Sequence, residues 1–157
     1  MLPKTLVQMV DDRKEIRIRA ARQEDLAPVE RLLVATGLAP DGIDDHLPTI
    51  LIAEHEHQIV ATAALEIYND SALLRSVAVD PDVRGTGVGK RITMEAINLA
   101  QRLEIDRLFL LTDTAGEFFP KFGFRVVSRL VIPDLVKSSI EFTSMCADTA
   151  LAMELRL

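Results

Sequence analysis

A glycine-rich turn between a strand and a helix constrains this sequence more than any other feature. Three glycines fall within five residues of the stretch Val77-Ala-Val-Asp-Pro-Asp-Val-Arg-Gly-Thr-Gly-Val-Gly-Lys90, where an apolar strand pattern ends and a helical pattern begins. Such a junction leaves backbone N–H groups at the positive end of a helix dipole. Glycines let the backbone approach a bulky anion closely, and Arg84 and Lys90 add positive charge. The stretch therefore predicts a phosphate or pyrophosphate site rather than a turn that only caps a helix.

Two known nucleotide motifs do not fit this stretch. A P-loop needs Gly-x4-Gly-Lys-Ser/Thr, but Arg84 stands at the first glycine position and Arg91 at the hydroxyl position. A dinucleotide fingerprint needs Gly-x-Gly-x-x-Gly, but Lys90 stands at the third glycine position. That fingerprint would also have to follow a first, parallel strand, whereas this strand follows a predicted hairpin. The sequence thus argues against a nucleotide-binding module.

The remaining patterns predict one mixed α/β (α+β) domain at 15–157, after a short N-terminal extension at 1–14. An antiparallel first half and a βαβ second half indicate a mixed central sheet of about six or seven strands, flanked by about four helices. The strand-like runs lie at 15–20, 49–53, 59–67, 72–79, 108–111, 124–127 and 150–157, and the helical ones at 25–37, 88–103, 117–122 and 134–140.

Apolar spacing assigns a buried face to each of the two longer helices. Asp25 is expected to cap the first helix, whose face consists of Leu26, Val29, Leu32 and Leu33. The second helix is expected to bury the residues Val88, Ile92, Ala96, Leu99 and Leu103.

Composition excludes several classes of protein. The 157 residues carry 18 Lys and Arg against 24 Asp and Glu, and the net charge of −6 argues against a general nucleic-acid partner. A single cysteine excludes a disulfide framework and favours a reducing, intracellular setting. No apolar run approaches the roughly 20 residues of a membrane helix, and the N-terminus lacks the pattern of a secretion signal. We therefore expect a cytoplasmic protein with no membrane partner.

Two motifs carry a family resemblance that runs over nearly the whole chain from Glu15. Arg84-x-x-Gly87-x-Gly89 after Val-Ala-Val-Asp-Pro, together with Phe119-Pro-Lys-Phe-Gly-Phe124, is similar to the acetyl-CoA signature and the aromatic-x-Lys-x-Gly-Phe ending of the GNAT superfamily of N-acetyltransferases. The resemblance implies a GNAT fold in which two strands splay apart and acetyl-CoA, as cosubstrate, lies in the gap. The residues that it implies in cosubstrate binding are Val77, Ala78, Val79, Arg84, Gly85, Thr86, Gly87, Val88, Gly89, Lys90, Thr112 and Phe119.

A closer resemblance is carried by two shorter segments. Leu111-Thr-Asp-Thr-Ala-Gly-Glu-Phe-Phe119 and Glu141-Phe-Thr-Ser-Met-Cys146 resemble the small N-acetyltransferases of arsenic-resistance operons. They are more distantly similar to the acetyltransferase domain of N-acetylglutamate synthases. The resemblance implies transfer of acetyl directly to the amine of a small molecule, an amino acid or a toxic analogue of one.

The catalytic residues depart from the common family pattern. The family often has a tyrosine as general acid where this chain has Phe119, and a glutamate as general base where it has Leu73. Glu66 is the best replacement base, with a solvated strand-end carboxylate as the competing interpretation. Tyr68, the only tyrosine, could protonate the leaving thiolate, although an ordinary edge tyrosine is the simpler interpretation. These departures keep a second hypothesis open, a non-catalytic acyl-CoA-binding sensor.

Arg75 is the charged residue inside an otherwise hydrophobic strand, and such a charge needs an anionic partner. Strand alternation predicts that Leu73, Arg75 and Val77 share one face, which the resemblance turns toward the acceptor. The partner of Arg75 is then either the carboxylate of an amino-acid-like substrate or an internal carboxylate, Glu66 or Glu141.

Two other segments with reactive or metal-binding residue types give weaker evidence for a functional site. Glu54-His-Glu-His57 is expected to be a solvated hairpin turn rather than a metal site, since alternating residues point to opposite faces. Cys146 is expected to be a small buried residue rather than a nucleophile or metalloid ligand. Without a Cys-His pair or activated serine, direct attack by the amine is favoured. The last strand could pair across a homodimer.

Overall fold

The computed structural model describes residues 15–113, 116–145 and 149–157, so the predicted extension at 1–14 lies outside the described residues. Seven strands form one mixed sheet in the order β1-β2-β3-β4-β5-β7-β6. The strands are β1 (Arg17–Ala20), β2 (Ile50–His55), β3 (Gln58–Tyr68), β4 (Ser71–Val79), β5 (Arg107–Thr112), β6 (Arg125–Val126) and β7 (Leu151–Arg156). The predicted mixed sheet is therefore confirmed, with each strand close to its expected place.

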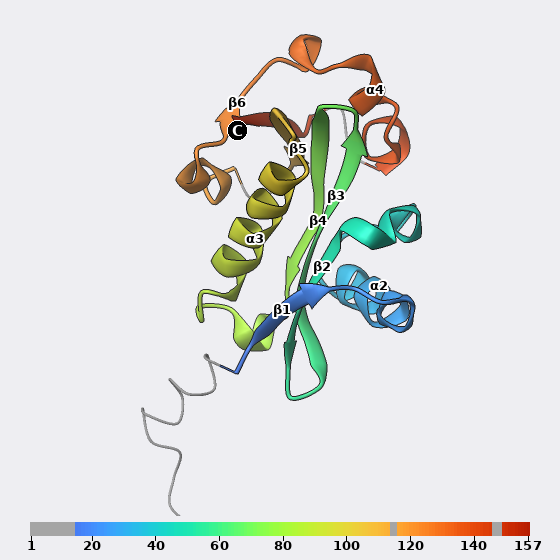
Figure 1. Ribbon diagram of the computed structural model, residues 1–157, viewed down its shortest axis with the longest axis vertical. Coiled ribbons are helices and arrows are strands. Elements are labelled where there is room, and N and C mark those ends of the chain that lie inside the picture. Colours follow the sequence, from blue (N-terminus) through green and yellow to red (C-terminus); the bar gives the residue numbers. More distant parts are fainter. Residues whose placement is uncertain (1–14, 114–115, 146–148) are drawn as a thin grey trace, which may run out of the picture.

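Three α-helices lie within the described residues: α2 (Leu26–Ala35), α3 (Val88–Arg102) and α4 (Asp134–Lys137). Helices α2 and α3 cover opposite faces of the sheet (Figure 1). Short 3-10 turns cover Gln23–Asp25, Ile43–Thr49, Pro81–Val83, Phe119–Phe122 and Arg129–Val131, and a π-helical turn covers Glu141–Met145. None of the helices in this described part is long and apolar enough to cross a membrane.

The sheet separates two larger apolar clusters. On one face, Ile92, Ala96 and Ala100 of α3 pack with Leu65 and Leu74. On the other face, α2 packs against β2, β3 and β4 through residues such as Val29, Leu33, Ile50, Ile52, Ala64 and Ala78. The buried face of α2 was predicted from helical spacing. Its buried residues Val29, Leu32 and Leu33 confirm that prediction.

Two helix-end predictions were wrong. Leu103 is 45% exposed, because α3 ends one residue earlier and its buried stripe passes through Thr93, Ile97 and Ala100 instead. Asp25 gives no side-chain cap to α2. Its carboxylate accepts the backbone N–H of Arg22 and pairs with Arg19 at 2.7 Å, so it closes the 3-10 turn that precedes the helix.

Candidate active site

The sheet opens between β4 and β5. These parallel strands pair only at Ser71–Leu73 with Arg107–Phe109, whereas β5 stays paired with β7 as far as Thr112. The backbone of β4 beyond Leu73 therefore lies along the edge of an opening, where its N–H and C=O groups can meet a ligand as an added strand would. A cavity of about 780 Å³ occupies this opening.

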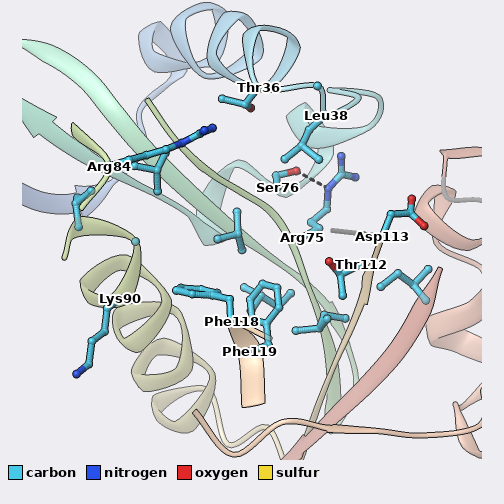
Figure 2. A pocket seen from close by; sticks show the side chains of 18 of the residues that line it. Thr36, Leu38, Arg75, Ser76, Arg84, Lys90, Thr112, Asp113, Phe118 and Phe119 are labelled. Carbon is cyan, nitrogen blue, oxygen red and sulfur yellow. Dashed lines mark hydrogen bonds between the residues drawn. The ribbon is translucent and has the colours of Figure 1, made fainter. Parts of the chain in front are cut away.

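The side chains around the cavity fall into two groups, which Figure 2 shows on opposite sides of the strands. The glycine end is lined by Val79, Arg84, Gly85, Gly87, Val88, Gly89, Lys90, Phe118 and Phe119. The Arg75 end is lined by Leu38, Leu73, Arg75, Leu111, Asp113 and Glu141. Thr112 lies between the two groups (Figure 2).

A β-bulge in β4 separates these ends. Ser76 has a positive φ of 55°, which is uncommon for a residue with a side chain. The pairing between β3 and β4 shifts register at the same place. Val77 consequently packs with the α3 face of the sheet, while Leu73 packs with Phe109 on the other. The prediction that Arg75 and Val77 share one face was therefore wrong, because an extra residue in one strand reverses the alternation that follows it.

The glycine end is shaped by backbone conformation. Gly85 and Gly87 have φ values of 82° and 85°, and a Cβ at either would meet nothing within 4 Å. Gly87 precedes α3, and its carbonyl accepts the N–H of Arg91. The N–H groups of the first helical turn, before Arg91, thus lie at the positive end of the helix, beside open space. This arrangement fits a bulky anion such as a pyrophosphate.

Close packing holds the start of α3 against β4. A Cβ on Gly89 would lie 3.2 Å from Cγ2 of Val79 and 3.9 Å from Cζ of Phe118. Glycine here lets the helix approach the strand edge more closely than another residue would allow. Phe118 and Phe119 stack edge to face, with ring centroids 5.1 Å apart, and form the apolar wall beside it.

The two basic side chains of the turn are exposed, and they extend in opposite directions. Figure 2 shows Arg84 extending toward Thr36 at the end of α2, while Lys90 points away along α3. Within the described part of the chain, neither forms an ion pair. Their charges therefore remain available to an anionic ligand at the cavity mouth.

Arg75 lies in a network of buried polar groups at the other end. Its side chain is 1% exposed, with Nη1 2.8 Å from Oε2 of Glu66 and Nε 3.2 Å from Oε1 of Glu141. Nη2 donates to the carbonyl of Asp41 at 2.9 Å, and Nε donates to Oγ of Ser76 at 3.0 Å. The internal salt bridge, one of two alternatives for Arg75, is thus present. A substrate carboxylate would have to share or replace these partners.

Glu66 and Tyr68 form the back of this network. Tyr68 donates its hydroxyl to Oε1 of Glu66 at 2.5 Å, and Nε2 of His46 lies 3.5 Å from Oε2. Burial raises the pKa of Glu66, but hydrogen bonds from Ser139, Tyr68 and Arg75 together hold that pKa below its usual value of 4.5. Neither Glu66 nor Tyr68 is among the residues that line the cavity. Their predicted catalytic roles have no direct support from this placement.

The tyrosine titration gives a direct test of this network. Burial and the hydrogen bond to Glu66 raise the pKa of Tyr68 from 10.0 to about 12. Because Tyr68 is the only tyrosine, the ultraviolet tyrosinate band reports it alone, and we expect its midpoint near pH 12. A raised folded-state pKa contributes stability that is complete below pH 10 and is lost as the pH rises toward 12. The difference in unfolding free energy between wild type and Tyr68→Phe should therefore narrow over this range. A midpoint near 10 would contradict the network.

Two residues of the cavity wall were not singled out from the sequence: Asp113 follows β5 directly, and Phe118 precedes the predicted aromatic motif. The loop Gly37–Ala39 after α2 also lines the cavity. Asp113 carried a usable signal, because a polar residue just after a buried parallel strand lies at the carboxyl edge of the sheet, where ligands bind. Glu141 was considered only as a partner for Arg75.

The residues of the Glu54–His57 hairpin do not line the cavity. Glu56 and His57 form the turn between β2, which ends at His55, and β3, as expected. No group of three or more His, Cys, Asp or Glu that could hold a metal occurs in the described ranges. Cys146 lies outside the described residues.

Comparison with known proteins places the chain among acetyltransferases. Residues 46–126 match the acetyltransferase (GNAT) domain. An amino-acid acetyltransferase of Mycobacterium tuberculosis is 32% identical over 118 residues, which cover 68% of this chain and 67% of that protein. An amino-acid acetyltransferase of Neisseria meningitidis is 27% identical over 76% of this chain, but the match spans only 29% of that longer protein.

Comparison with solved structures also finds acetyltransferases with a similar fold. N-acetylglutamate synthase from Neisseria gonorrhoeae, complexed with coenzyme A and N-acetyl-glutamate, superimposes with a TM-score of 0.79 at 23% identity. The superposition covers 90% of this chain and 35% of that one. The arsenic-operon resemblance stays a prediction. With the domain match over half of its length and the Mycobacterium relative over two thirds, the chain belongs to the GNAT acetyltransferase family.

Proposed function

We propose that this protein transfers acetyl from acetyl-CoA directly to the amine of a small molecule, an amino acid or a toxic amino-acid analogue. One observation carries the proposal: the glycine turn at the start of α3 opens on the same cavity as the unpaired edge of β4. Phosphates held at the turn would place the rest of the cosubstrate along β4. The amino-acid acetyltransferases among the relatives support an amino-acid acceptor.

The chain's own groups suit this reaction. The acetyl thioester needs a donor at its carbonyl oxygen, and backbone N–H groups at Val77 or Ala78 on the strand edge can supply one. The described residues that line the cavity include neither cysteine nor histidine. Direct attack by the amine is therefore favoured over an acetyl-enzyme intermediate. The amine must lose its proton before attack, since an alkylammonium has a pKa near 10.

Glu66 and Tyr68 support the reaction by holding Arg75 rather than by exchanging protons with substrate. Replacing Tyr68 with phenylalanine should then change kcat by less than about fivefold, whereas loss of a proton donor in the reaction costs about 100-fold or more. Steady-state thiol release by wild type and Tyr68→Phe decides between the two roles. A large fall in kcat at unchanged acceptor KM would restore Tyr68 as the general acid.

An acceptor screen tests the proposed function itself. The purified protein and acetyl-CoA are incubated with amino acids, phosphinic and arsenic-containing analogues, and polyamines, and thiol release is measured. Release with an amino acid or one of its analogues is the expected result. Binding of acetyl-CoA without release across the whole panel would contradict the proposal and favour a non-catalytic acyl-CoA sensor.

A further inference from the structure

The Arg75 end of the cavity carries more negative than positive charge. Its charged lining residues, among those described, are Arg75, Asp113 and Glu141. Glu66 lies directly behind them, 2.8 Å from the Arg75 guanidinium. Arg75 therefore shares this end of the cavity with Asp113 and Glu141, and Glu66 lies behind it. Since Glu66 and Glu141 both pair with Arg75, the charge of this guanidinium is already matched without a substrate.

Asp113 is placed differently from the other two carboxylates. It follows the last residue of β5, is exposed, and pairs with no cation in the described part of the chain. The last pair between β4 and β5 joins Leu73 to Phe109, and Asp113 stands four residues further along β5. Because the bulge at Ser76 adds a residue to β4, Asp113 lies across the opening from the stretch 77–78 of that strand.

The side chain of Asp113 belongs to the Arg75 end rather than to the glycine end. Phe109 and Leu111 pack in the same cluster as Leu73, and alternation along the strand continues this face to Asp113. Figure 2 shows Asp113 and Arg75 extending to the same side of the strands, opposite Phe118 and Phe119. A group that approaches the backbone of Val77 from this side therefore passes Asp113.

We propose that Asp113 binds the amino group of the acceptor, and that the side chain of the acceptor is neutral or cationic rather than acidic. The inference rests on the proposed function, which puts the thioester beside Val77 and requires an ammonium group to arrive across the gap. A carboxylate at that point attracts the ammonium group and holds its nitrogen next to the thioester. Because Arg75 is already paired with Glu66 and Glu141, it offers no unmatched charge to an acidic side chain on the acceptor, which meets the carboxylates of this end instead.

A panel of three amino acids isolates this charge effect. L-ornithine, L-glutamine and L-glutamate share the α-amino and α-carboxylate groups and carry cationic, neutral and anionic side chains. We expect kcat/KM for thiol release to be at least about tenfold lower with glutamate than with glutamine, and ornithine to match or exceed glutamine. A preference for glutamate leaves the proposed function intact and overturns this inference. No release with any amino acid contradicts the proposed function itself.

A matched pair of variants tests the role of Asp113. Asp106 and Asp113 flank β5 at its two ends and both are exposed, but only Asp113 lines the cavity. Asp113→Asn should raise the KM for L-ornithine at least about tenfold without changing the KM for acetyl-CoA, and should narrow the ratio between glutamine and glutamate. Asp106→Asn should change none of these values.

Calorimetric binding of L-glutamine in the presence of coenzyme A gives a readout that does not depend on turnover. Asp113→Asn should weaken this binding, while Asp106→Asn should leave it as in wild type. Equal binding by wild type and Asp113→Asn would overturn the assignment.

Discussion

Replacing Glu66 with alanine should lower the free energy of unfolding by about 3–5 kcal/mol, because it leaves a buried guanidinium without its nearest carboxylate. Arg75 and Glu66 are each 1% exposed, and their nitrogen and oxygen lie 2.8 Å apart. The same substitution removes the acceptor for the Tyr68 hydroxyl. Urea unfolding followed by circular dichroism measures the loss.

Two further variants show whether the buried pair is the cause. Glu24→Ala removes an exposed carboxylate and should change stability by less than about 0.5 kcal/mol. Glu66→Leu with Arg75→Met removes both charges and should recover most of the loss, because a buried ion pair can often be replaced by apolar groups of similar volume. A loss below about 1 kcal/mol for Glu66→Ala would be no larger than the contribution of an exposed ion pair. It would mean that Glu141 alone is enough to pair Arg75.

Removing the two basic side chains of the glycine turn should abolish most of the affinity for coenzyme A. Each charge-assisted contact to a phosphate contributes about 1.5–3 kcal/mol, and about 1.4 kcal/mol corresponds to a factor of ten. The double variant Arg84→Ala/Lys90→Ala should therefore bind coenzyme A at least about 100-fold more weakly, as measured by calorimetry. The backbone N–H groups at the start of α3 would supply the binding that remains.

A second double variant controls for the change in net charge. Arg102→Ala/Arg125→Ala also removes two positive charges, but from exposed positions at the last residue of α3 and on β6, both toward the end of α3 opposite the turn (Figure 1). It should leave the affinity for coenzyme A within about twofold of wild type, since charges more than about 10 Å away are screened by salt. Equal losses in the two double variants would show that overall charge, and not the turn, governs binding.

Much of the fold could be predicted because its signals are local. The alternation in β1 and the apolar run in β5 depend only on neighbouring residues and on how strands expose two faces. The same holds for the glycine turn, where the residue type itself permits the positive φ values of Gly85 and Gly87. The placement of β7 between β5 and β6 was not predicted, because the residue pattern within one strand does not indicate which other strands it pairs with.

The candidate site was predicted less completely, because its ends depend on contacts between distant segments. A positive φ at Ser76 has no signature in its residue type, so the reversal of faces after Arg75 could not be read from alternation. The partners of Arg75 come from β3, from the loop after α2 and from the segment after α4. Only the assembled protein brings these segments together.

The sequence by itself determined the glycine turn, the strand that precedes it and the helix that follows, and with them the candidate anion-binding end of the cavity. These features rest on backbone freedom, periodicity and charge within fourteen consecutive residues, Val77 to Lys90. Only the tertiary structure decided which charges line the other end of the cavity. The separation of β5 from β4 exposes Asp113 to the cavity, while the folding of three segments around Arg75 neutralises the residue that the sequence had marked for a carboxylate.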